Sequence, residues 1–208
     1  MDISTDVLDA QIRIRPYLND TALICSEYYS ELGQANVYLK LENLQPTGSF
    51  KVRGAFNKLL TLTDEQRGKG IVTASSGNHG AAVAMALSKT ESTGVVFVPE
   101  HASCAKVANI ERLGAQVKFF GDDAAVTETY AREYAAERGA VFISPYNDRD
   151  VAAGQGTLAV ELFRQLRCVD AVFVALGGGG LLAGVAAHVS SVSPPPGCMG
   201  PLRKIPRL

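Results

Sequence analysis

The sequence has no tryptophan, few histidines and no excess of charge of either sign. Its 208 residues include 3 histidines, 20 basic residues and 21 acidic residues, so the formal net charge is -1. Proteins that bind nucleic acids ordinarily carry a basic patch that neutralises phosphates. The balanced charge therefore predicts no nucleic-acid partner, and a hydrophobic content of 47% is typical of a chain that buries a core.

Cysteines and histidines are too scattered to form a metal site. A zinc site needs ligands at short, repeated spacings such as Cys-x-x-Cys. No such spacing occurs among these side chains, which are Cys25, Cys104, Cys168, Cys198, His79, His101 and His188. We expect no metal ion.

A targeting segment is also missing from the beginning of the chain. Residues 1–6 are acidic and lack the apolar core of a signal peptide. The apolar run 169–189 is long enough to cross a bilayer, and Gly180 and Gly184 in it have the GxxxG spacing of membrane helices. Asp170 and a run of four glycines favour a soluble strand, turn and helix instead. We expect a cytoplasmic protein without a membrane partner.

One lysine lies between a strand pattern and a helix pattern. Residues 37–41 alternate apolar and polar side chains as a short strand does, and residues 46–48 then turn the chain. Helical spacing follows in the apolar residues Phe50, Ala55, Phe56, Leu59 and Leu60. Lys51 therefore falls at a helix start, where the helix dipole and burial both favour a neutral amine. Such an amine suits Schiff-base chemistry with an aldehyde cofactor, although a surface lysine in a first helical turn gives the same local pattern.

Glycines form a second motif near the C-terminal end. A strand-like run, residues 170–176, leads into Gly177, Gly178, Gly179 and Gly180, and a helix-like run, 181–187, follows. Backbone amides of such a loop can converge on an anion beside the positive end of the helix dipole. The pattern predicts a phosphate cradle.

Two nucleotide-binding motifs are alternative interpretations of the same glycines. Gly178, Gly180 and Ala183 match the dinucleotide pattern G-x-G-x-x-A, which expects an acidic residue about twenty positions further on. No acidic residue follows Asp170, and the Gly-Lys-Ser/Thr ending of a Walker loop is absent. A cradle for a single phosphate explains the glycines best.

The third motif, residues 75–80, again joins a strand to a helix. A strand-like run, 71–74, precedes it and a helix of small residues, 81–87, follows. Backbone amides at such a helix start can hold a carboxylate, and the Asn78 amide and Ser76 hydroxyl can add hydrogen bonds. The same residue types also serve as ordinary helix caps.

Together, residues 49–55, 75–80 and 177–180 resemble, in order and spacing, the threonine/serine dehydratase family. That family consists of pyridoxal-phosphate enzymes of the tryptophan-synthase β fold and includes serine racemase. Further stretches that resemble it are residues 39–48, 98–100, 145–148 and 153–157. The resemblance extends from about Ile12 to Ser193, and the motifs support one another.

The resemblance implies a role for each motif around pyridoxal 5'-phosphate. Lys51 would form the Schiff-base link and later carry the Cα proton. Phe50 would pack beside the pyridine ring and Asn78 would bond its phenolic oxygen. The cofactor phosphate would be held by Gly177, Gly178, Gly179 and Gly180.

For the substrate, the resemblance implies a carboxylate clamp made by Ser75, Ser76, Gly77, Asn78 and His79. Ser76 would also face Lys51 as a second acid/base group. The implied reaction is lyase chemistry of amino-acid metabolism, in which L-threonine or L-serine loses its hydroxyl and then ammonia to give a 2-oxo acid. Serine racemase also has a group at the position of Ser76, so racemisation stays an alternative.

Strand-like and helix-like runs alternate along the chain. Strand-like runs occur near Val37, Ile71, Val95, Val117, Val141 and Val172, and helices are predicted at 107–113 and 124–138, each closed by a glycine. This alternation predicts an α/β protein with parallel sheets covered by helices. The resemblance implies two three-layer αβα domains, namely an incomplete larger cofactor domain (residues 1–65 and 148–193) and a smaller inserted one (66–147). It also implies a homo-oligomer once the full-length fold is completed.

The last residues depart from the family pattern. Residues 194–208 form a tail rich in proline and basic residues, where the family continues with an apolar strand and a further part of its catalytic domain. If the codons are read from the third base at Gly197, the shifted frame can encode a strand that resembles the family. A frameshift is therefore one hypothesis for the origin of this tail, and a natural short paralogue is the other. Re-reading the nucleotides after Val192 would decide between the two.

Such a shortened chain changes the expected function. The resemblance implies that a residue facing the pyridine nitrogen, a cation site and several covering elements lie beyond this point, so that apolar faces would be exposed. The alternatives to a working enzyme are therefore a non-catalytic fragment that binds the cofactor weakly and one that associates with full-length subunits.

Overall fold

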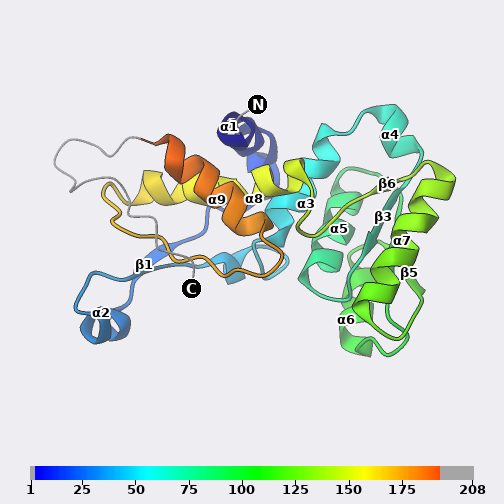
Figure 1. Cartoon of the computed structure of the whole chain (residues 1–208), viewed down its shortest axis with the longest axis horizontal. Helices are drawn as coiled ribbons and strands as arrows, with labels where there is room; N and C mark the ends of the chain where they lie inside the picture. The colour runs from blue at the N-terminus through cyan, green and yellow to red at the C-terminus, as the bar shows by residue number, and fades with distance from the viewer. Residues whose placement is uncertain (1–2, 193–208) are drawn as a thin grey trace.

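The computed structural model describes residues 3–192, in which helices surround a parallel sheet and a small antiparallel strand pair lies apart from it (Figure 1). The α/β class predicted from the sequence is confirmed. The frameshift hypothesis and the tail 194–208 concern residues outside the described range.

A four-stranded parallel sheet occupies the middle of the chain. Its strands stand in the order β5, β4, β3, β6, with the bounds β3 (Ile71–Ala74), β4 (Gly94–Val98), β5 (Gln116–Phe119) and β6 (Val141–Phe142). In the register of the sheet, Ile71 lies opposite Gly94 on one side and Val141 on the other. Because the strands are parallel, the loops that follow them begin at one edge of the sheet.

Helices cover both faces of this sheet. Two of them, α5 (Asn78–Lys89) and α6 (Cys104–Arg112), pack on one face, whereas α7 (Ala124–Arg138) packs on the other (Figure 1). The helix predicted at 124–138 is confirmed, because Asp123 caps its first amides and Gly139 ends it with a φ of 62°. The helix predicted at 107–113 is α6, which begins three residues earlier at Cys104.

The remaining helices form a second layer beside the sheet. At its centre, α8 (Arg149–Gln165) contacts α1 (Ile3–Ile14), α3 (Lys51–Thr61) and α9 (Gly180–Ser191). Smaller elements complete this part, namely η1 (Arg15–Tyr17), β1 (Leu23–Cys25), α2 (Glu27–Gly33), β2 (Tyr38–Lys40), η2 (Glu42–Leu44) and α4 (Asp64–Gly68). The antiparallel pair is formed by β1 and β2, with Leu23 opposite Lys40.

The strand predicted near Val172 is not present among the described residues. Residues 170–176 are assigned to neither strand nor helix, and Phe173 is 86% exposed and Leu176 is 70% exposed. A strand needs a neighbouring strand for its backbone hydrogen bonds, and residues 3–192 offer none at this position. The apolar pattern was read correctly, but the prediction of a buried strand was wrong.

The apolar run 169–189 is likewise divided between this exposed segment and the twelve-residue helix α9. Within residues 3–192, no helix has the length and apolar character needed to cross a membrane. The parallel sheet lies inside residues 66–147, but the division into a larger and a smaller domain stays a prediction.

Candidate functional site

Lys51 is the first residue of α3, as the sequence predicts. Gly48 turns the chain just before it with a φ of 74°, and Phe50 precedes the helix without capping it through a side chain. The Lys51 amine donates a hydrogen bond to the Pro145 carbonyl oxygen at 2.7 Å. Its nitrogen also lies 5.4 Å from the centre of the Phe50 ring. The amine is thus held between an apolar ring and one acceptor.

Burial changes the chemistry of this amine. The pKa of Lys51 is lowered from its ordinary value because burial removes water from the ammonium group. The start of α3 adds the positive end of the helix dipole, which also disfavours a second positive charge. A lysine that loses its proton more easily is a better nucleophile toward an aldehyde.

The second motif lies at the start of α5. Ser75 directly follows β3, and its hydroxyl accepts a hydrogen bond from the Gly77 amide at 3.2 Å. Gly77 caps the helix and Asn78 is its first residue. The first amides of a helix have no partner within it, so this turn presents free donors to an anion.

His79 faces inward from the same turn. Its Nε2 lies 3.2 Å from the Ile143 carbonyl oxygen, and because a carbonyl only accepts, this nitrogen carries the proton. The pKa of His79 is lowered to about 4, mainly by burial and also by the nearby Lys51 charge, whereas the hydrogen bond to Ile143 opposes the shift. The imidazole is therefore neutral and bonded through Nε2, while its buried Nδ1 has no hydrogen-bond partner within residues 3–192. The predicted carboxylate clamp would use the backbone amide of His79.

Glycines of the third motif lie at the start of α9. Gly179 adopts a φ of 87°, and the helix begins at Gly180. A side chain added at Gly177 or Gly179 would meet nothing within 4 Å, whereas one at Gly178 would collide with the Tyr146 ring. Two of the four glycines thus border open space.

A single segment, residues 143–146, joins the three motifs. Ile143 accepts from His79, Pro145 accepts from Lys51, and the Tyr146 ring covers Gly178. The starts of α3, α5 and α9 therefore converge on this segment, which leads from β6 toward α8. Tyr146 also donates to the Glu128 carboxylate at 3.2 Å, which ties the segment to α7.

The residues around this convergence fit pyridoxal phosphate. The Lys51 amine can react with its aldehyde, and the glycine loop before α9 offers open space beside unpaired helix amides. The side-chain oxygens of Thr47 and Ser49 are buried just before Lys51 and have no hydrogen-bond partner within residues 3–192. A polar ligand would satisfy such atoms.

Two predicted site residues, Ser76 and Asn78, form no hydrogen bond with the Lys51 amine within residues 3–192. Ser76 is half-buried and Asn78 is exposed, and neither side chain forms a hydrogen bond within the part of the chain that the structure describes. Their predicted roles, an acid/base group and a partner of the pyridine oxygen, stay predictions. No role was predicted for Arg53 or Tyr146, although they lie within the stretches 49–55 and 145–148.

Comparison with known proteins gives one family and several relatives. The family model described as "Pyridoxal-phosphate dependent enzyme" matches residues 14–201. The catabolic L-threonine dehydratase of Escherichia coli K12 is 41% identical over 189 residues, which are 91% of this chain and 57% of that protein. The corresponding enzyme of Staphylococcus aureus N315 is 43% identical over 190 residues, again 91% of this chain but 55% of that protein.

Solved structures show the same relationship. The processed threonine deaminase isoform 2 of Solanum lycopersicum has a TM-score of 0.88 and 34% identity over 92% of this chain and 52% of its own. Maize serine racemase has a TM-score of 0.87 and 35% identity over 92% of this chain and 58% of its own. The chain thus spans little more than half the length of these relatives.

Proposed function

The chain belongs to the family of pyridoxal-phosphate-dependent enzymes, and from that premise we propose that its site serves threonine/serine ammonia-lyase chemistry. The observation that carries the proposal is Lys51, a half-buried amine at the start of α3 with a lowered pKa. Similarity to L-threonine dehydratases of two bacteria and to a plant threonine deaminase supports the choice of reaction.

Each motif has a task in this proposal. Lys51 would hold the cofactor through its aldehyde and would later carry the Cα proton of the substrate. Amides of the glycine loop 177–180 would hold the phosphate, Phe50 would pack beside the ring and Asn78 would bond its phenolic oxygen. When bound, pyridoxal phosphate supplies an electron sink that eases removal of the Cα proton.

The turn 75–79 binds the substrate in this proposal. Its amides hold the carboxylate of L-threonine or L-serine, which orients the Cα proton toward the Lys51 amine. The hydroxyl group then leaves, and hydrolysis yields a 2-oxo acid and ammonia. Ser76 serves as a second proton carrier, and its use on the opposite face would give the racemisation performed by relatives such as maize serine racemase.

A non-catalytic fragment is the second candidate function. It is favoured by the exposed apolar residues Phe173 and Leu176, and the region aligned with the Escherichia coli relative covers 57% of that protein. Such a fragment would bind the cofactor weakly or associate with full-length subunits.

The test mixes the purified chain with pyridoxal phosphate and records its visible absorbance beside a Lys51→Ala variant. We expect a yellow band that only the unmodified lysine gives, followed by ammonia and 2-oxo acid release from L-threonine or L-serine. A band without product would favour the fragment. No Lys51-dependent band in folded protein would contradict the cofactor site itself.

A further inference from the structure

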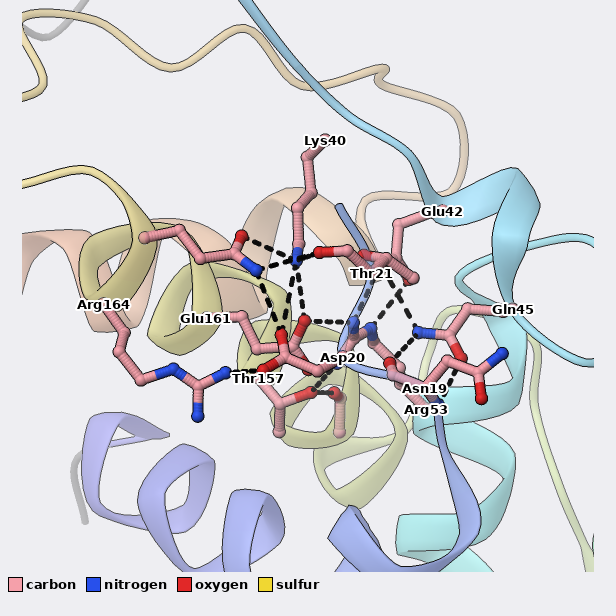
Figure 2. Close-up of polar contacts among 12 residues, drawn as sticks. Asn19, Asp20, Thr21, Lys40, Glu42, Gln45, Arg53, Thr157, Glu161 and Arg164 are labelled. Carbon is pink, nitrogen blue, oxygen red and sulfur yellow. Dashed lines mark hydrogen bonds and ion pairs between the residues drawn. The ribbon is translucent and has the colours of Figure 1, made fainter. Parts of the chain in front are cut away.

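Arg53, two residues after Lys51, has the largest fully buried side chain within residues 3–192. Its guanidinium has five N–H groups, and it donates five hydrogen bonds, to Glu42, Thr157 and Glu161 (Figure 2). A buried charge is normally costly. Here each of the five N–H groups can be matched to a hydrogen bond.

The hydrogen bonds have the geometry of two forks. Nε and Nη2 donate to the two oxygens of Glu42 at 2.7 and 2.8 Å. Nη1 and Nη2 donate to the two oxygens of Glu161 at 2.8 and 2.9 Å, and Nη1 also reaches the Thr157 hydroxyl at 3.1 Å. Only the planar guanidinium can make both forks, because a lysine has a single ammonium group.

Lys40 completes a balanced group of charges, which we call the Arg53 cluster (Lys40, Glu42, Arg53 and Glu161). Its amine donates to Glu161 at 2.7 Å. Burial alone would raise the pKa of Glu161, but Arg53 and Lys40 lower it, so the carboxylate stays charged. Figure 2 shows how the cluster joins β2, η2, α3 and α8.

The cluster lies where α3 and α8 touch through their backbones. A side chain added at Gly54 would come within 2.7 Å of the Val151 carbonyl oxygen, and one added at Gly154 within 2.6 Å of the Arg53 carbonyl oxygen. The start of α3 has no side-chain cap of its own. Its position therefore depends on this crossing and on the Arg53 cluster.

Stability alone does not account for such a cluster. Replacing a buried ion pair by well-packed apolar residues is often neutral or stabilising, whereas removing one partner costs about 3–5 kcal/mol. What balanced forks supply is a fixed geometry, since two planar carboxylates hold one planar guanidinium in one orientation.

We propose that Arg53 is a positioning residue for Lys51, because it locks the first turn of α3 to η2 and α8 and thereby holds the Lys51 amine against the Pro145 carbonyl. The inference rests on the proposed function in that this amine is the one that binds the cofactor. Without the cluster, the first turn of α3 loosens and the amine gains access to water.

The test measures the Lys51 amine in the cofactor-free chain. Its rate of acetylation is followed against pH by mass spectrometry of the Lys51 peptide, with the exposed Lys89 as internal reference. The test variant combines Arg53→Met with Glu42→Gln, which removes one charge of each sign and leaves Lys40 paired with Glu161. We expect the pKa of Lys51 to rise toward the ordinary lysine value of 10.5, with about tenfold lower reactivity below its midpoint for a shift of one pKa unit.

Phe56→Leu is the matched control, because this buried residue lies on the same helix but outside the Arg53 cluster. It lowers stability, measured by urea unfolding, and leaves the Lys51 titration unchanged. His79 couples to the charge of Lys51 but, with a pKa of about 4, it stays neutral through the titration.

An unchanged Lys51 titration in the folded double variant would overturn the proposal. Should that variant not fold, Glu42→Gln alone is used, and it shifts the titration less but in the same direction; no shift again overturns the inference. A chain that takes up no pyridoxal phosphate contradicts the proposed function only, because the labelling measurement needs no cofactor.

Discussion

At the scale of single residues, His79 makes folding depend on pH. Its pKa falls from 6.5 in the unfolded chain to about 4 in the folded chain. Between these two pH values, the unfolded chain binds a proton at His79 and the folded chain does not. Protons therefore favour unfolding, and stability is lost as the pH drops below 6.5 until the loss is complete near pH 4.

We expect this histidine to cost about 2 kcal/mol of the free energy of unfolding between pH 7 and pH 5. The measurement is urea unfolding at both pH values for the unmodified chain and for His79→Gln, whose amide nitrogen can donate to Ile143 in the same way. The variant loses less stability on acidification. Equal losses in the two proteins would mean that His79 is not the group responsible.

Gly178 and Tyr146 give a second residue-scale prediction. A methyl group at Gly178 collides with the Tyr146 ring, so Gly178→Ala displaces the ring and its hydrogen bond to Glu128. We expect a loss of about 1–3 kcal/mol in the free energy of unfolding, as for other overpacked sites. Urea unfolding measures it.

The neighbouring Gly177→Ala is the control, because its methyl group meets nothing within 4 Å and costs little stability. Adding Tyr146→Gly to Gly178→Ala removes both the ring and the Cβ atom that the new methyl group would meet, so Gly178→Ala costs less stability in this background than it does alone. If the two changes were simply additive, contact with Tyr146 would not be the reason for a glycine at this position.

At the scale of elements, the crossing of α3 and α8 requires glycine. A methyl group at Gly154 lies 2.6 Å from the Arg53 carbonyl oxygen and 2.7 Å from the Cα atom of Gly54, and backbone atoms cannot move aside cheaply. Gly154→Ala therefore separates the two helices and destabilises the fold by about 1–3 kcal/mol or more.

Gly68→Ala provides the opposite outcome in the same unfolding experiment. This glycine ends α4 and has open space around it, so alanine stabilises by about 0.4–1 kcal/mol through the unfolded state. Gly154→Ala at least as stable as the unmodified chain would show that the helices are not as close as described.

Elements with local signals were predictable from the sequence. Asp123 and Gly139 mark both ends of α7, and Lys51 was placed correctly at the start of α3. The strand at 170–176 was not, because strand formation depends on a partner that local sequence cannot supply. Arg53 was missed for a similar reason, since its partner Glu161 lies 108 residues away.

In the candidate site, too, the local motifs were predictable from the sequence, whereas the contacts between them were not. The glycine loop at 177–180 and the turn at 75–79 were read as helix starts, and both precede helices in the structure. Their meeting around residues 143–146 depends on tertiary contacts of Ile143, Pro145 and Tyr146, which no local pattern reveals.

At the scale of the whole molecule, the segment 170–176 leaves apolar surface in water. Phe173 is 86% exposed and Leu176 is 70% exposed, on a backbone without strand partners among residues 3–192. A backbone without strand partners among residues 3–192, beside exposed apolar side chains, forms a surface to which another chain can bind. This surface bears directly on whether the protein acts alone or through association.

We expect the chain to self-associate as its concentration rises, and Phe173→Ser with Leu176→Ser to reduce this association. The matched control is Tyr28→Ser with Leu32→Ser on α2, which removes two apolar side chains that are 70% and 72% exposed on a helix whose backbone is already hydrogen-bonded. Light scattering over a concentration series measures the mean mass of each protein, and urea unfolding checks that both variants stay folded. Equal mass for the two variants would show that exposed apolar area in general drives association. A lower mass for the 170–176 variant alone would place the contact at this segment, whose backbone has no strand partner among residues 3–192.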